Sequence, residues 1–225
     1  MGLTVYGDPL SPLYCAVTVF CKVTGIPYTD KRINLTKGEQ KGEAYLKISP
    51  FGQVPSIVDD DFSLTQCFSI LKYLAVKNKV ADHWYPAEFK ARAKVNEYLD
   101  WHHTSLRKWV VIIFHEQVLN PKFGKPTDVE KLAKDYEKFD ETIGAIEKKF
   151  LGDGAFLCGR DEISIADICA VLELMQIVCI QQTDGLAKHP KLAAWKDRVI
   201  KRLNPAYDEV NQPMRKVAAS EASKK

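Results

Sequence analysis

Residues 50–74 read PFGQVPSIVDDDFSLTQCFSILKYL, and this stretch decides the fold of the chain. Val54-Pro55 falls where a loop meets a strand, a place where proline either caps an edge strand or forms a cis bond in a tight turn. Both arrangements leave the backbone of Val54 free. After a second strand and an acidic turn, a helix is predicted to open at Gln66, so its unpaired amide groups lie near the same turn. The stretch predicts either an anion-binding site or a hairpin and helix that serve only as scaffold.

The composition bounds the class of protein. With 225 residues, of which 46% are hydrophobic and 27% charged, the chain can bury one large core or two small ones. The net charge is only +3, and the basic residues are scattered among 29 acidic ones, which argues against nucleic acid as a partner. The N-terminal residues lack the pattern of a signal peptide, and the longest purely apolar stretch, 109–114, is too short to span a bilayer. We therefore expect a cytoplasmic protein without membrane insertion.

The cysteines and histidines show no metal-binding pattern. Six cysteines, at positions 15, 21, 67, 158, 169 and 179, never approach a C-x-x-C spacing and lie mostly in apolar segments. They are predicted to be reduced core thiols rather than zinc ligands or a disulfide framework. The adjacent His102 and His103 would point about 100° apart on a helix, so no metal site is expected.

Residues 1–78 predict a small mixed α/β domain. A strand at 3–7 is followed by a helical run from Leu13 through Cys21, which the segment starting at Gly25 closes, and by a second strand from 29 to 35. Ser11 stands at the N-cap of that helix, where a hydroxyl lies beside free amide groups. A strand, helix, strand unit implies a parallel pair with a right-handed crossover.

Residues 79–88 are predicted to be a linker, and residues 89–225 an all-helical domain. One long helix is expected from 89 to 118, and a second follows a capping box at Thr127–Glu130, with an apolar stripe from Val129 to Phe150. A third helix begins at the Ser164–Asp167 box and is apolar on all sides, which predicts that it is buried. His189-Pro190 leads into the last amphipathic helix, and the tail from Val217 is expected to be frayed.

The chain resembles the cytosolic glutathione S-transferases over nearly its whole length. Four segments, LSP at 10–12, DFSLTQCFSILKYL at 61–74, ARAKVNEYLDWHHTSLR at 91–107 and FLCGRDEISIAD at 156–167, are most similar to the theta class and its serine-type relatives. The resemblance implies a thioredoxin-like α/β domain followed by an all-α helical bundle domain. It also implies a cytoplasmic, homodimeric transferase of detoxification that uses glutathione as co-substrate and no metal.

The chemistry of that family requires a thiolate. A free thiol has a pKa near 8.5, and lowering that pKa by about two units requires roughly 2.7 kcal/mol. A hydrogen bond to a charged acceptor supplies about 1.5–3 kcal/mol and a helix N-terminus about 0.3–1 kcal/mol more. The resemblance implies that Ser11 gives both, although a serine that only caps the helix is the simpler interpretation.

Two other residues compete for the catalytic role. Tyr6 lies near the position used by the tyrosine classes of the family, but the LSP motif that follows makes it the second choice. Cys15 suggests a thiol-reductase relative, in which a cysteine forms a mixed disulfide with glutathione. In those relatives the cysteine occupies the cap, where this chain has Ser11, so Cys15 is predicted to be structural.

The resemblance also implies the residues that bind glutathione. The backbone of Gln53 and Val54, before a cis Pro55, is expected to pair with the tripeptide, and Gln40 and Lys41 to hold its glycine carboxylate. These two also fit a solvated loop. The chain departs from the family at Gln66 and Cys67, where an acidic residue and a serine are usual. If each lost interaction costs about 1–2 kcal/mol, the affinity for glutathione falls about ten- to several-hundred-fold.

A second substrate is expected beside the predicted long helix. Thr104, Arg107, Val111 and His115 share one face by their spacing, and Leu10 and Leu13 add apolar wall. Arg107 matches a theta-class arginine that lies over the active site, although a surface arginine is the alternative.

Three functions remain open on the sequence. The first is a glutathione transferase acting on small hydrophobic electrophiles. The second is a weakly active or non-catalytic binding module of the same fold for a hydrophobic ligand or a protein partner, favoured by Gln66-Cys67. The third is a glutathione-dependent peroxidase or thiol oxidoreductase.

Overall fold

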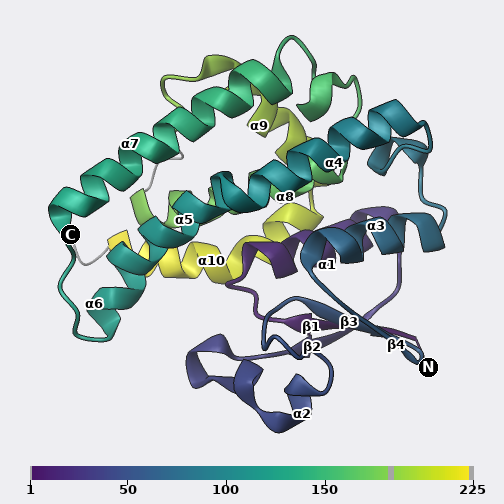
Figure 1. Ribbon diagram of the computed structural model, residues 1–225, viewed down its shortest axis with the longest axis horizontal. Coiled ribbons are helices and arrows are strands. Elements are labelled where there is room, and N and C mark those ends of the chain that lie inside the picture. Colours follow the sequence, from purple (N-terminus) through teal and green to yellow (C-terminus); the bar gives the residue numbers. More distant parts are fainter. Residues whose placement is uncertain (1, 182–184, 223–225) are drawn as a thin grey trace.

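The computed structural model describes residues 2–181 and 185–222, which form a mixed α/β part beneath a helical part (Figure 1). The α/β part contains β1 (Leu3–Gly7), α1 (Pro12–Thr24), β2 (Thr29–Arg32), α2 (Glu43–Leu46), β3 (Ser56–Asp59), β4 (Phe62–Thr65) and α3 (Cys67–Lys77). The sheet has four strands in the order β2-β1-β3-β4. β1 pairs parallel to β2 and antiparallel to β3, and β3 pairs antiparallel to β4. The predicted parallel pair and hairpin are confirmed.

α1 ends where the sequence predicts, whereas β2 does not. α1 ends at Thr24, because Gly25 supplies the left-handed residue (φ 70°) that closes it. The strand expected to reach Leu35 ends at Arg32 instead. Asn34 caps a 3₁₀ turn, Leu35–Lys37, and its side-chain oxygen accepts the N–H of Lys37 at 3.0 Å. The local turn chemistry of asparagine therefore overrides the strand pattern.

Gly7 allows the close approach that places the start of α1 on the sheet. A Cβ at Gly7 would lie 2.2 Å from Cδ2 of Tyr14, which no side chain can tolerate. The first turn of α1 therefore packs directly on the end of β1, and Ser11 stands in the short connection between them.

The opening stretch forms the predicted turn, hairpin and helix. The Val54–Pro55 peptide is cis, β3 and β4 follow, and Asp60 occupies the turn between them with φ 57°. α3 begins at Cys67 and not at Gln66, which is its N-cap residue. Gln66 has φ 71°, an uncommon conformation for a residue with a side chain, and such residues tend to occur at binding sites.

The predicted helix from 89 to 118 is not continuous. It is divided into α4 (Phe89–Thr104) and α5 (Leu106–Phe114), because Ser105 leaves the helical region at φ −123° and ψ −84°. A π-helical turn, His115–Leu119, and α6 (Asn120–Lys122) then follow. A short 3₁₀ turn, Asp82–Trp84, precedes α4. Apolar periodicity continues across the break, so the pattern alone does not reveal it.

α7 (Val129–Ala145) is capped by Asp128 and not by Thr127. The carboxylate of Asp128 accepts the N–H of Lys131 at 3.0 Å, whereas the hydroxyl of Thr127 donates to the carbonyl of Glu116 at 3.1 Å. Val129, predicted to begin the apolar stripe, is 74% exposed. A second π-helical turn, Ile146–Leu151, and a 3₁₀ turn, Leu157–Gly159, connect α7 to the next helix.

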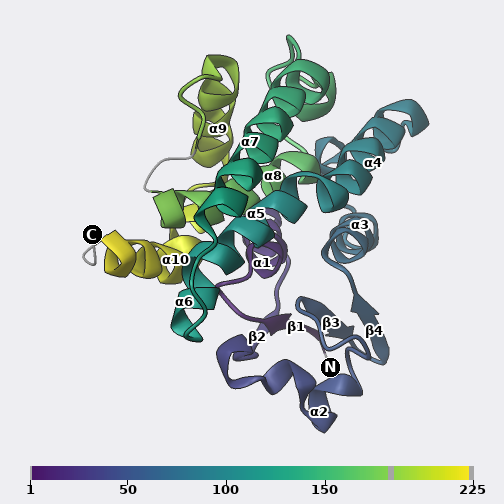
Figure 2. The ribbon, with the colours of Figure 1, turned by 60° about the vertical axis from the view of Figure 1, so that its left-hand side comes forward.

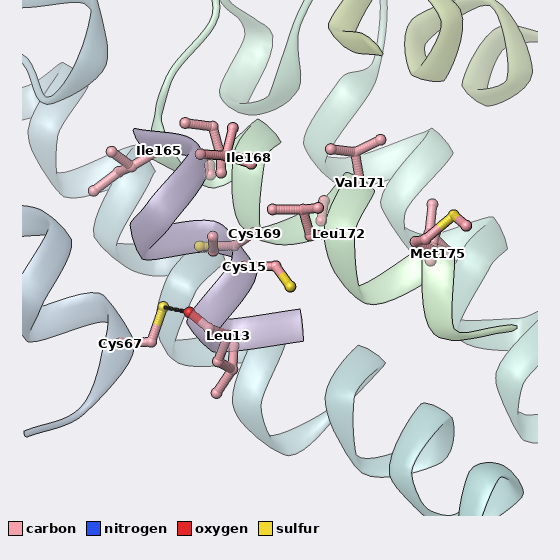
Figure 3. Packing of buried hydrophobic residues seen from close by; sticks show 14 of the residues in the cluster. Leu13, Cys15, Cys67, Ile165, Ile168, Cys169, Val171, Leu172 and Met175 are labelled. Atoms are coloured by element: carbon pink, nitrogen blue, oxygen red, sulfur yellow. Dashed lines mark hydrogen bonds between the residues drawn. The ribbon is translucent and has the colours of Figure 1, made fainter. Parts of the chain in front are cut away.

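α8 (Ile165–Gln181) is the central buried helix, as predicted. Its capping box is confirmed, since the carboxylate of Asp167 accepts the N–H of Ser164 at 2.8 Å and also the indole N–H of Trp195 at 2.8 Å. α8 lies beside α1 (Figure 2), so the two parts of the molecule share one core. Figure 3 shows side chains of α1, α3 and α8 meeting in this layer.

The C-terminal segment contains a helix that the sequence pattern did not predict. α9 (Pro190–Leu203) is the predicted amphipathic helix, and α10 (Ala206–Ala222) follows it. The described part of the tail expected to fray from Val217 is helical. α10 is anchored by the buried side chains of Ala206, Tyr207, Asn211 and Met214. Pro213 lies inside this helix, and a proline there argues against a helix when only the sequence is considered. Residues 223–225 lie outside the described residues.

The described cysteines are free thiols. Cys15, Cys21, Cys67 and Cys169 are buried, and Cys158 is half-buried. The side chain of Cys179 lies outside the described residues. Among the residues described, no helix is long and apolar enough to cross a membrane, and no cluster of three or more His, Cys, Asp or Glu side chains is suited to a metal ion.

Candidate active site

Two adjoining cavities lie between the α/β part and the helical part, and both are lined by Ser11, Leu35 and Arg107. The first has a volume of about 520 Å³ and is polar. It is also lined by Leu13, Gln40, Gly52, Gln53, Val54, Pro55, Gln66, Cys67 and His103. The second, of about 400 Å³, is mainly apolar.

Ser11 occupies the N-cap of α1 and faces both cavities. Its Oγ accepts the N–H of Tyr14 at 3.4 Å, which leaves the hydroxyl hydrogen available to another acceptor. The first-turn amides of α1 add a positive electrostatic potential at the same point.

The two competitors lie elsewhere. Tyr6 lines neither cavity, and its ring packs against Tyr45 with centroids 6.1 Å apart. The thiol of Cys15 is buried and donates to the carbonyl of Pro9 at 3.3 Å. Burial raises the pKa of Cys15 to about 12, so it is a neutral thiol at pH 7.

The cis turn presents free backbone to the first cavity. The carbonyl of Gln53 accepts hydrogen bonds from the hydroxyls of Tyr45 (2.8 Å) and Ser49 (2.9 Å), which hold the turn in place. Among the residues described, the N–H and C=O of Val54 have no hydrogen-bond partner. The geometry predicted for a strand-like peptide contact is therefore available.

Gln66 and Cys67 lie on the cavity wall but differ in what they offer. The amide nitrogen of Gln66 lies 3.4 Å from Oε1 of Gln53, so the two side chains meet at the turn. The thiol of Cys67 is buried and donates to the carbonyl of Leu13 at 3.3 Å (Figure 3). The backbone N–H of Cys67, in the first turn of α3, remains the group available to an anion.

Gln40 and Lys41 differ in their relation to this cavity. Gln40 lines it, and its buried Oε1 has no hydrogen-bond partner among the described residues. Lys41 is exposed and is not part of the lining. Its Nζ reaches the rim at Gly52, where an added Cβ would lie 3.1 Å away.

The second cavity collects most of the residues predicted for the second substrate. Leu10, Arg107, Val111 and His115 line it, with Phe114, Val118, Leu119, Phe123, Met214 and Val217. Two of the predicted residues do not line this cavity. Leu13 lines the first cavity instead, and Thr104 is exposed and lines neither, because the break at Ser105 turns it away from the face that carries Arg107.

Behind Arg107 lies a buried network that the sequence pattern does not predict. Glu173, which has no solvent exposure, accepts hydrogen bonds from Nη1 of Arg107 at 3.1 and 3.3 Å, and Nε2 of His102 lies 3.3 Å from the same carboxylate. Burial alone would raise the pKa of Glu173, but Arg107 and His102 hold it below its ordinary value. Glu173, a carboxylate in the middle of the apolar sequence of α8, was the signal that could have revealed this network.

His103 lines the first cavity and contacts Phe68, with ring centroids 4.4 Å apart. Burial, His102 and Arg107 lower the pKa of His103 below its ordinary value. His103 is therefore mainly neutral at pH 7, and Arg107 is the cation beside Ser11.

Comparison with known proteins identifies the family. A family model for the glutathione S-transferase N-terminal domain matches residues 1–76, and one for the glutathione S-transferase C-terminal domain matches residues 108–202. Human glutathione S-transferase theta-1 is 41% identical over 203 residues, which cover 88% of this chain and 82% of the human protein. Glutathione S-transferase T1 of Arabidopsis thaliana is 36% identical over 96% of this chain and 91% of its own length.

Solved structures of theta-class glutathione transferases are similar to this chain in fold. Human glutathione transferase theta-2 in complex with glutathione has a TM-score of 0.93 and 36% identity over 99% of this chain and 91% of its own. The human theta-class enzyme in complex with the glutathione conjugate of 1-menaphthyl sulfate also has a TM-score of 0.93, at 36% identity over 100% of this chain and 91% of its own.

The chain therefore belongs to the glutathione S-transferase family. Within that family it is similar to theta-class enzymes, and it is a glutathione transferase that uses glutathione as co-substrate. The binding-module and thiol-oxidoreductase hypotheses are not favoured, because the relatives over most of the chain are transferases.

Proposed function

We propose that the protein joins the glutathione thiolate to small hydrophobic electrophiles, with Ser11 as the catalytic residue. The observation that carries this proposal is the position of Ser11, at the cap of α1 and in the wall of both cavities. Its hydroxyl donates to the thiolate sulfur, and the positive potential at the N-terminal end of α1 adds to the stabilisation. Together these contribute about 2–4 kcal/mol, enough to lower the thiol pKa by roughly two units.

Glutathione is proposed to occupy the first cavity. The backbone of Val54, before Pro55, pairs with the tripeptide, and the side chains of Gln53 and Gln66 and the amide of Cys67 bind its γ-glutamyl end. Gln40 and Lys41 receive the glycine carboxylate. The support is that all but Lys41 line one polar cavity, and that human theta-2 was solved with glutathione bound.

The electrophile is proposed to occupy the second cavity, against Leu10, Val111 and His115. Arg107 stands between the cavities and stabilises negative charge on the sulfur or on a departing anion. A human theta-class structure contains the glutathione conjugate of 1-menaphthyl sulfate, and this complex supports a small hydrophobic electrophile as the second substrate.

The organisation of the whole protein is part of the proposal. The glutathione domain comprises residues 1–78, the linker 79–88 and the helical domain 89–225. The enzyme acts as a cytoplasmic homodimer in the removal of reactive compounds, as is usual in the family.

A glutathione titration combined with a model electrophile tests the catalytic role. Ser11→Ala should abolish thiolate formation at neutral pH, followed by the ultraviolet absorbance of bound thiolate, and should lower stability by about 1 kcal/mol through the lost cap. Ser11→Thr keeps both hydroxyl and cap and should retain activity. Unchanged turnover in Ser11→Ala would refute the role of Ser11, and no saturable binding at millimolar glutathione would refute the proposed site.

A further inference from the structure

The carboxylate of Glu173 is a charged group in a helix whose described side chains are otherwise nearly all apolar and buried. Its oxygens lie 3.1 and 3.3 Å from Nη1 of Arg107, and Oε2 lies 3.3 Å from Nε2 of His102. The hydroxyl of Tyr98 lies 3.2 Å from Nδ1 of the same histidine. A buried carboxylate without such partners would strongly destabilise the fold, so these contacts explain how α8 accommodates a charge.

The break between α4 and α5 brings both basic partners to this carboxylate. His102 and Arg107 are five positions apart, and on a continuous helix their side chains would point about 140° apart. Ser105 interrupts the helix between them, and both then reach Glu173. The break at Ser105, which the sequence pattern did not predict, is therefore needed for both side chains to reach Glu173.

Arg107 lines both cavities, whereas Glu173 lines neither. The Arg107 side chain is 26% exposed, and its rotamers are numerous. Two contacts from one nitrogen to a fixed, fully buried carboxylate select one of these rotamers. The remaining guanidinium nitrogens then point to a defined place, which a free surface arginine would not achieve.

We infer that Glu173 is a positioning residue that fixes the guanidinium of Arg107 at the junction of the two cavities. This inference rests on the proposed role of Arg107. Glu173 touches neither substrate and acts only through Arg107. Replacement of the carboxylate therefore removes what Arg107 contributes to the reaction, even though Arg107 itself is still present.

A double-mutant cycle tests the inference. Arg107→Ala should lower kcat/KM by about ten- to a hundredfold, the loss expected for one charged hydrogen bond to the transition state. Glu173→Met, similar in length and apolar, should lower kcat/KM by a comparable factor. The double variant should be no worse than Arg107→Ala alone, because a residue that acts only through Arg107 has nothing left to position.

A purely structural role gives a different result. In that case the losses multiply in the double variant, or Glu173→Met keeps normal kcat/KM below its unfolding temperature, and either result overturns the inference. Unchanged kcat/KM in Arg107→Ala overturns it as well. Ser11→Ala tests the thiolate step alone. A failure of the proposed function at that step can therefore be distinguished from a failure of the inference about Glu173.

Two further variants guard against loss of folding. Glu173→Gln keeps an acceptor for Arg107 and should give an intermediate loss, which can be measured if the methionine variant is unstable. Glu147→Gln is the matched control, because that carboxylate also accepts from a histidine (His189 Nδ1, 3.1 Å) and lines neither cavity. It should lower the unfolding temperature without changing kcat/KM, either alone or in combination with Arg107→Ala.

Discussion

The thiol of Cys67 donates to the main-chain carbonyl of Leu13 at 3.3 Å, which ties the first turn of α3 to the first turn of α1. The side chain of Cys67 is therefore turned into the core, where it lies 1% exposed, and its backbone N–H, in the first turn of α3, is the donor that remains available. Gln66, the other departure from the family pattern, keeps its amide in the cavity but carries no charge.

Restoring the usual family residues should strengthen glutathione binding. Gln66→Glu supplies a carboxylate for the γ-glutamyl ammonium. Cys67→Ser supplies a hydroxyl that can turn from the carbonyl of Leu13 to the γ-glutamyl carboxylate. The affinity should rise about tenfold or more, since each recovered interaction contributes about 1–2 kcal/mol. Isothermal titration calorimetry measures the change, and weaker binding would show that this part of the site is misassigned.

Gly52 is expected to be essential to the first cavity. It has φ 57°, and a Cβ there would lie 2.8 Å from the carbonyl oxygen of Gln40. Gly52→Ala should lower both stability, by about 1–2 kcal/mol for the left-handed backbone, and glutathione affinity. Gly25→Ala provides the control, because Gly25 has φ 70° with open space around its Cβ. It should lose stability alone, as chemical denaturation and calorimetry would report. Equal glutathione affinity in both variants would contradict this prediction.

The lowered pKa of His103 should make the protein less stable in mild acid. Its ordinary pKa is 6.5, and in the folded state burial, His102 and Arg107 hold it lower. As the pH falls below 6.5, the unfolded chain takes up a proton more readily than the folded one, so the free energy of unfolding decreases. His103→Gln removes this contribution. Urea denaturation at pH 7 and pH 5 should show a smaller loss in the variant than in the wild type; the same loss in both would disprove the assignment.

Filling the second cavity should separate the two substrates. Val111→Trp places a large side chain in a cavity of about 400 Å³. The KM for a bulky electrophile should rise about tenfold or more while the KM for glutathione changes little, because lost uniform binding appears in KM. Thr104→Trp is the matched control, since Thr104 is exposed and lines neither cavity. A rise in the glutathione KM of the Val111 variant would argue against separate subsites.

The parts of this molecule that local chemistry determines could be predicted from the sequence. The serine cap of α1, the Ser164–Asp167 box and the Val-Pro turn each depend on residues within a few positions of one another. The residues predicted to bind glutathione, except Lys41, accordingly line one cavity.

The remaining features depend on contacts between distant segments. The break at Ser105 leaves the apolar period intact, so only the meeting of α4, α5 and α8 around Glu173 reveals it. α10 is likewise held by burial of Tyr207 and Met214 against other helices rather than by its own pattern. Thr104 was expected beside the second substrate because helix spacing gives a face but not the neighbour that covers it.

Ser11, Leu35 and Arg107 belong to the walls of both cavities, so the two cavities adjoin. With glutathione in the first cavity and the electrophile in the second, as proposed, the conjugate is one molecule that spans both. Two modest affinities then act together through a high effective concentration, and the conjugate binds more tightly than either reactant. The enzyme is thereby exposed to inhibition by its own product, and its turnover depends on how quickly that conjugate is removed.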